Sequence, residues 1–125
     1  MSNKLLPQKN NLIGKILTRE TVGCDVDERK HSGTDNPYII YGFDDIRPFC
    51  FCSGRARKTM HSGIVDIYSV GNCPNELRDK VMKLLGNAGI KVAALPEGYT
   101  EERREWTLRI QFRYESVNNF GDESL

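Results

Sequence analysis

The stretch GIVDIYSVGNCPNELRDKVMKLLGNAGI, residues 63–90, predicts a strand followed by a helix. Residues 64–70 are rich in β-branched and aromatic side chains, which favour a central strand. Apolar residues then recur at helical spacing and form one stripe: Leu77, Val81, Leu84, Leu85 and Ala88. Pro74 suits the first helical position, Gly89 is the expected stop, and Ile90 is placed to fold back on the last turn. The stripe predicts that this helix packs on a sheet.

Residues 106–115, WTLRIQFRYE, alternate between apolar and polar side chains without error. This pattern is typical of a half-buried antiparallel strand with one wet face. Ten residues span about 33 Å, more than most strands. Such a length suits an element that runs past its own domain, and it equally suits a long strand in a large sheet. A short strand over residues 91–95 precedes it, ended by Pro96.

The N-terminal third predicts one helix and one loop. Apolar residues form a stripe over residues 10–19, with Asn10 or Asn11 as the cap, although Gly14 weakens the helix. Residues 23–36 are polar and aperiodic, and they predict a loop.

The middle of the chain predicts two strands with turns around them. Residues 38–41 read as a strand, residues 42–45 as a turn, and residues 47–52 as a second strand. Pro48 indicates that the second strand lies at an edge. Residues 53–62 are polar and basic, and they predict a loop before the central strand.

These elements predict an α+β fold with the order α-β-β-β-α-β-β. The expected sheet is mostly antiparallel or mixed, with four to five strands and two helices packed on it. At 125 residues the chain fits one domain, which we expect over residues 1–117, with a flexible C-terminal tail over 118–125. Hydrophobic residues make up 38% and charged residues 28%, which is typical of a globular protein. No stretch approaches the ~20 apolar residues of a membrane span, so we expect no membrane association and a cytosolic site of synthesis.

The formal net charge is +1, which argues against a general attraction to nucleic acid or membrane. The charge is mildly uneven: residues 1–62 carry ten Lys/Arg against seven Asp/Glu, and residues 63–125 carry eight against ten. An excess of this size can form a local patch without being a nucleic-acid signature.

Four residues have the chemistry of zinc ligands: Cys50, Cys52, His61 and Cys73. Their spacing does not match the paired knuckles of structural zinc sites. Phe49 and Phe51 flank the cysteines and favour small buried thiols in a core instead. We therefore expect no metal and no cofactor.

The sequence carries none of the common catalytic signatures. The sequence contains neither a phosphate-cradling glycine loop nor a nucleophile elbow. His31 and His61 both fall in predicted loops, and nothing local pairs either with a cysteine nucleophile such as Cys24. No catalytic residue is predicted, and the chain is expected not to be an enzyme.

The basic segment Arg55, Arg57 and Lys58 is the best local candidate for function. It reads either as a solvated hairpin loop or as a contact with a neighbouring subunit or with DNA phosphates. Polar residues of the last strand extend this surface and form a candidate assembly face: Arg109, Gln111 and Arg113. No aromatic residues interleave with them, which weighs against a platform for single-stranded nucleic acid.

The order of elements resembles the tail-terminator and tail-completion proteins of long-tailed bacteriophages and prophages. The resemblance covers residues 37–114, and four segments carry it: 37–41, 63–69, 76–90 and 106–114. The run FCFC at 49–52 and residues 23–36 do not match that family. The resemblance implies a non-catalytic ring subunit, often a hexamer, that stops growth of the tail tube and joins the tail to the head connector.

The resemblance also implies partners and a location. The partners would be further copies of the chain, the tail tube protein and the head–tail connector protein, with non-specific contact to DNA passing through the ring. Arg55, Arg57 and Lys58 would then face the lumen. The protein would reside in the tail or neck of the virion, and in the host cytoplasm during assembly.

Other functions stay open. The same pattern fits a non-viral protein-interaction domain or another phage neck protein. A small enzyme or a nucleic-acid binder remains a further alternative.

Overall fold

A computed structural model describes residues 11–30, 35–52 and 54–117, and it excludes the side chains of Cys52 and Ala56. The expected C-terminal tail at 118–125 lies outside these residues. The described chain forms one mixed sheet of six strands. Their bounds are β1 Asp25–Glu28, β2 Tyr38–Cys52, β3 Arg55–Val70, β4 Lys91–Ala94, β5 Gly98–Thr100 and β6 Glu105–Val117. The order is β1-β2-β3-β6-β4, with β5 also pairing with β6, and only β1 and β2 are parallel.

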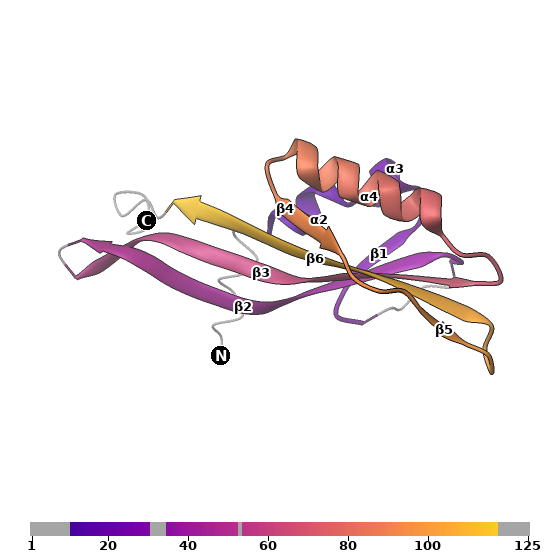
Figure 1. Cartoon of the computed structure of the whole chain (residues 1–125). Helices are drawn as coiled ribbons and strands as arrows, with labels where there is room; N and C mark the ends of the chain where they lie inside the picture. The colour runs from indigo at the N-terminus through magenta and orange to yellow at the C-terminus, as the bar shows by residue number, and fades with distance from the viewer. Residues whose placement is uncertain (1–10, 31–34, 53, 118–125) are drawn as a thin grey trace.

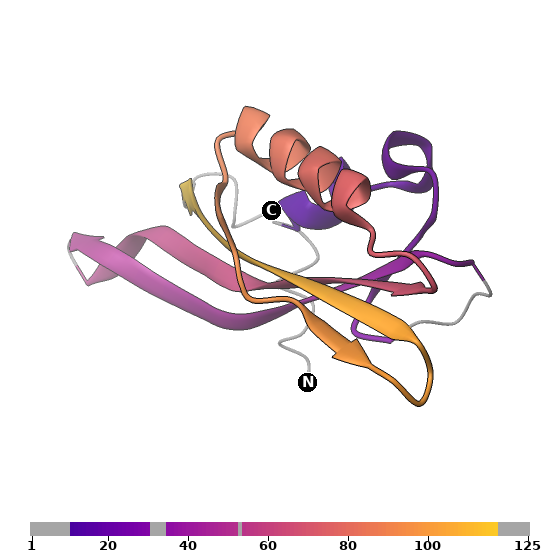
Figure 2. The ribbon, with the colours of Figure 1, turned by 45° about the vertical axis from the view of Figure 1, so that its right-hand side comes forward.

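Three helices lie on the same side of this sheet: α2 (Leu12–Ile16), α3 (Arg19–Val22) and α4 (Asn75–Asn87), as Figures 1 and 2 show. The α+β class and the mixed sheet are confirmed. The expected four to five strands and two helices are wrong, because the described residues form six strands and three helices. Among the described residues, no helix has both the length and the apolar character needed to cross a bilayer.

The core lies between the helices and one face of the sheet. Side chains of β3 and β6 alternate between the two faces, as predicted for β6, and Val65, Ile67 and Ile110 are fully buried. They pack against Val81 and Leu85 of α4, which are also fully buried. The alternation of β6 is confirmed, and residues 64–70 lie in the central strand β3.

The end of α4 follows the predicted pattern. Gly89 has a φ of 85°, which an L side chain rarely adopts. The Ile90 amide donates to the Leu85 carbonyl at 3.1 Å, and the Gly89 amide donates to the Gly86 carbonyl at 3.0 Å. These two hydrogen bonds form the Schellman motif, which satisfies carbonyls that the helix end leaves free. At the other end Pro74 is the N-cap and not the first helical residue, so the helix begins one residue later than expected.

The single helix expected over residues 10–19 is two short helices. Asn11 caps α2 as predicted, because its side chain accepts from the Gly14 amide at 2.9 Å. Thr18 starts α3 with a capping box to Thr21, and the intervening Leu17 is extended. The first helix therefore ends before Thr18, and the capping box at Thr18 begins a new one.

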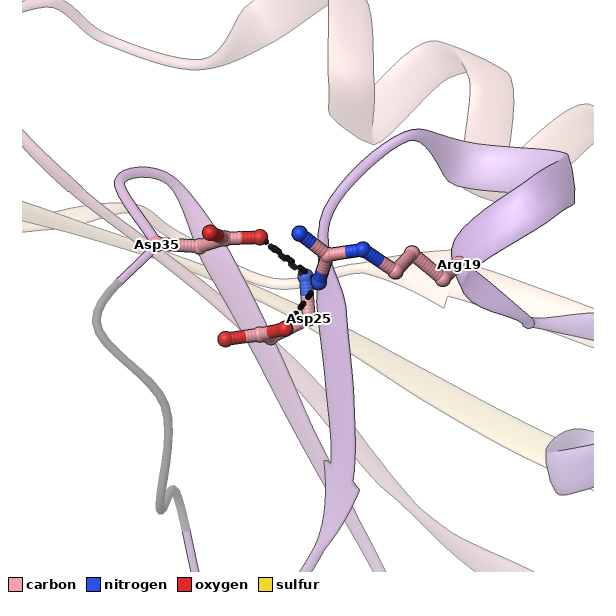
Figure 3. Close-up of polar contacts among 3 residues, drawn as sticks. All are labelled: Arg19, Asp25 and Asp35. Carbon is pink, nitrogen blue, oxygen red and sulfur yellow. Dashed lines mark hydrogen bonds and ion pairs between the residues drawn. The ribbon is translucent and has the colours of Figure 1, made fainter.

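The loop expected over residues 23–36 contains strand β1. Arg19 of α3 bridges the carboxylates of Asp25, at the start of β1, and Asp35, just before β2 (Figure 3). Asp35 also accepts from the Asp25 amide at 3.0 Å. These contacts tie α3, β1 and the approach to β2 together, which local propensity could not indicate.

The turn expected at residues 42–45 and the loop expected at 53–62 are both wrong. The β2–β3 ladder continues through the first segment, with a register shift between Phe43 and Asp45, and β3 begins at Arg55. Cross-strand pairing therefore extends Gly42 and the basic residues into strands, in spite of their weak strand propensity.

Candidate assembly surface

The sheet runs on past its helices, and we call this part the sheet extension. It consists of residues 45–52 of β2, 55–60 of β3 and 115–117 of β6. Both ribbon views show β2 and β3 reaching well beyond the helix layer, with the end of β6 beside them (Figures 1 and 2). The ladder is paired to its tip, where Cys52 opposes Arg55 and Lys58 opposes Val117.

No described side chain of the sheet extension is buried. The last buried side chains before it are His61 on β3 and Tyr114 on β6. A strand pair with two open faces is marginal in water, because it lacks a hydrophobic face to cover. The extension is therefore held by its continuity with the body of the sheet.

Large apolar side chains are exposed along the extension. Phe51 is 65% exposed, Val117 76% and Ile46 37%. Ile46 lies on one face of the extension and Phe51 and Val117 lie on the other, so both faces carry exposed apolar groups that a partner could cover.

The predicted basic segment lies on this extension, in a strand and not in a loop. Alternation along β3 places Arg55 and Arg57 on the face that carries His61, and Lys58 on the opposite face. Lys58 lies 3.7 Å from the Glu115 carboxylate of β6. The structure therefore brings Arg55 and Arg57 together and separates Lys58 from them.

The outer edge of β2 carries no partner strand beyond Tyr41 within the described residues, since β1 pairs only with Tyr38–Tyr41. The edge location predicted from Pro48 is confirmed. Pro48 offers no amide donor, the register shifts near Asp44, and Cys50 has a φ of 57°. Such irregularities blunt an edge against strand addition. The edge of the extension is therefore poorly suited to strand addition, and its faces are the surfaces that remain open.

His61 lies where the extension joins the body. It is 2% exposed, and its ring stacks on Tyr114 with centroids 4.7 Å apart. Its Nε2 lies 2.8 Å from Ser116 Oγ, whereas Nδ1 has no hydrogen-bond partner among the described residues. Burial lowers the pKa of His61, because the apolar site disfavours the imidazolium. The prediction that His61 lies in a loop is wrong.

The residues weighed as zinc ligands are not brought together. Cys50 is exposed on the extension, His61 is in the core, and Cys73 follows the far end of β3. Among the described residues no group of three or more His, Cys, Asp and Glu side chains could hold a metal ion. The expectation that Cys50 and its neighbour Phe51 are core residues is wrong, because this part of β2 has no helix above it.

The candidate assembly face Arg109, Gln111 and Arg113 lies on the side of the sheet opposite the helices, and all three are exposed. Arg109 forms a bidentate pair with Asp66 at 2.7 and 3.0 Å, which raises the pKa of Arg109. Arg113 and Gln111 line a shallow hollow of about 340 Å³ beside Lys91. Arg109 is therefore already paired, whereas Gln111 and Arg113 remain on an open polar surface.

Sequence reasoning missed the exposed apolar residues Ile46, Phe51 and Val117. The lengths of the elements in the structure explain their exposure, and the sequence did not give the length of β3 because residues 53–62 predict a loop. The 13 residues of α4 span about 20 Å, whereas the 16 residues of β3 span about 50 Å. A helix of that length cannot cover such strands.

No protein-family model matches the chain, and no curated protein matches it significantly.

Proposed function

We propose that the protein is a structural subunit of a bacteriophage or prophage particle. In this proposal it ends growth of the tail tube and joins the tail to the head connector, as a member of a ring. The order of strands and helices that resembles tail-terminator proteins supports the family. The sheet extension supports the mode of action.

One observation carries the proposal: no described side chain of the extension is buried, although its strands stay paired to the tip. A sheet built this way exposes Ile46, Phe51 and Val117 to solvent at a cost of roughly 25 cal/mol for each Å² that a partner would cover. Association removes that cost. Subunits that must assemble with their own copies and with other virion proteins need such surfaces.

Gene deletion tests this function. In a strain that produces the particles, deletion should give tails of irregular length and heads without tails, seen by electron microscopy. Supplying the wild-type chain from a plasmid should restore joined particles. Normal particles in the deletion strain would contradict the proposal.

A matched pair of variants links the function to the extension. Arg55→Glu with Arg57→Glu changes the extension, whereas Lys80→Glu with Lys83→Glu makes the same charge change on the exposed side of α4. We expect the first pair to fail in complementation and the second to succeed. Equal complementation by both would remove the extension from the function, and the chain would then act through another surface.

A further inference from the structure

The exposed large apolar residues of the described chain gather at its two ends. Ile46, Phe51 and Val117 lie on the sheet extension, and Val70 and Tyr99 lie at the opposite end. That end is formed by the end of β3, by β5 and by the start of β6, and Figure 1 shows it on the far side of the molecule from the hairpin tip. We call Val70 and residues 97–106 the acidic end.

The two ends carry opposite charge. The extension has four cations and two anions, a balance of +2: Arg47, Arg55, Arg57 and Lys58 against Asp45 and Glu115. The acidic end has four anions and two cations, a balance of −2: Glu97, Glu101, Glu102 and Glu105 against Arg103 and Arg104. The net charge of +1 for the whole chain hides this separation.

The acidic end carries an exposed aromatic residue on β5 and exposed carboxylates in the turn that follows it. Tyr99 is 47% exposed and lies against Trp106, with ring centroids 4.7 Å apart. Glu101 and Glu102 are exposed and have no ion-pair partner within the described part of the chain. Glu105 is different, because it is 8% exposed and lies 3.6 Å from Arg103. Two exposed carboxylates in the turn after Tyr99 are therefore open to a basic, apolar partner.

We propose that the sheet extension of one copy binds the acidic end of a second copy of this chain. The inference rests on the proposed ring and names the two surfaces that meet in it. Ile46, which shares the face of Arg55 and Arg57, supplies apolar contact together with Tyr99 of the other copy, and Arg55 and Arg57 against Glu101 and Glu102 set the orientation. Because the two surfaces differ, the contact leaves one free surface of each kind at the ends of a row of copies, so it repeats, and it closes into the proposed ring where the rotation between copies allows it.

Charge also disfavours the symmetric alternative. A two-fold contact between two extensions would bring +2 against +2, and a contact between two acidic ends would bring −2 against −2. Like charges across an interface suppress the wrong pairing. The head-to-tail contact is the arrangement in which both ends of every copy find opposite charge.

A charge-swap experiment on the full chain tests this contact. Variant one carries Arg55→Glu and Arg57→Glu, and variant two carries Glu101→Lys and Glu102→Lys. Each alone should raise the dissociation constant for self-association by at least about tenfold, measured by sedimentation velocity. Mixed in equal amounts, the two should associate again, because each extension then meets an end of opposite charge.

Controls separate this contact from the ring itself. Lys80→Glu with Lys83→Glu should associate like the wild type. Ile46→Ser should weaken association without changing any charge, because Ile46 is exposed on the face of Arg55 and Arg57. Circular dichroism checks that every variant remains folded.

Each outcome decides a different proposal. Wild-type oligomers that both swap variants leave intact would overturn this contact and leave the ring standing. A wild type that stays monomeric at every concentration would overturn self-assembly as well. Variants that each weaken association but do not recover on mixing would show that the two ends do not meet each other. If both swap variants still form oligomers and the extension binds duplex DNA, that surface would belong to a nucleic-acid contact instead.

Discussion

Gly63 lies in β3 where the neighbouring strands and the core leave no room for a side chain. A Cβ at this position would lie 2.1 Å from the Gly42 carbonyl oxygen and 2.8 Å from Phe112 Cζ. The first of these atoms is backbone and cannot move without shifting β2. The close approach of β2 and β3 before the register shift therefore depends on this glycine.

We predict that Gly63→Ala destabilises the fold by about 1–3 kcal/mol or more, the usual cost of overpacking. Gly98→Ala is the control, because a Cβ at Gly98 meets nothing within 4 Å. Urea unfolding of both variants measures the difference. Equal stability of the two variants would show that the strands are not packed this closely.

His61 is the buried titratable residue at the root of the extension. Phe43 meets its ring edge-on and Tyr114 stacks on it, so few groups can support an added proton. Its pKa in the folded chain is below the ordinary 6.5 because of burial. The unfolded chain thus binds a proton at higher pH than the folded chain does. The contribution of neutral His61 to the free energy of unfolding is fully present above about pH 6.5. It is lost as the pH falls towards the pKa of His61 in the folded chain.

We predict that the free energy of unfolding falls between pH 7 and pH 5 by at most about 1.4 kcal/mol per pH unit from this residue. In His61→Gln the fall should be smaller, although the variant is less stable overall. Denaturant unfolding at both pH values measures the two slopes. Parallel slopes for wild type and variant would mean that His61 does not titrate in this window.

At the scale of elements, the strands are longer than the helices that cover them. The fully buried residues of β3 and α4 define the covered part, and β2, β3 and β6 continue beyond it. Folding of the covered part and assembly through the uncovered part should therefore respond to different substitutions.

We predict that Phe51→Ser changes the free energy of unfolding by less than about 0.5 kcal/mol, because Phe51 is 65% exposed. Leu85→Ala should lower the free energy of unfolding by about 2–5 kcal/mol, because Leu85 is fully buried between α4 and the sheet. Thermal or urea unfolding at a concentration where both are monomeric separates the two effects. A large loss of stability in Phe51→Ser would place the extension inside the cooperative core.

Strong local patterns predicted the elements that they control. The stripe of α4, its Gly89 stop and the alternation of β6 were all readable from the sequence, because each follows from the helical or strand period. The elements missed depend on distant partners. Strand β1 has four residues and pairs with β2, and Arg55 enters a strand because Cys52 opposes it across the hairpin.

The candidate site was only half predictable. Arg55, Arg57 and Lys58 were found as a basic segment, but their separation onto two faces needs the strand that the sequence did not reveal. The apolar character of Phe51 predicts a place in the core. Its exposure follows from where the helix layer stops, which is a property of the whole sheet.

At the scale of the whole molecule, the two ends of the structure carry opposite charge. The sheet extension is basic and the acidic end is negative, and both expose apolar side chains. A contact of this kind combines screened charge with apolar burial. We predict that self-association weakens several-fold from about 0.05 to 0.5 M salt, as the Debye length shortens. Sedimentation velocity across that range measures it. Association that strengthens with salt would point to a contact that is apolar alone.

The native mass of the full chain tests assembly through the extension most directly. Electrospray of the intact protein from a solution of high protein concentration reports the number of copies in each species. We expect one discrete closed oligomer, which is lost in Arg55→Glu with Arg57→Glu and kept in Lys80→Glu with Lys83→Glu. A wild type that is monomeric throughout, or an oligomer unchanged in the extension variant, would contradict it.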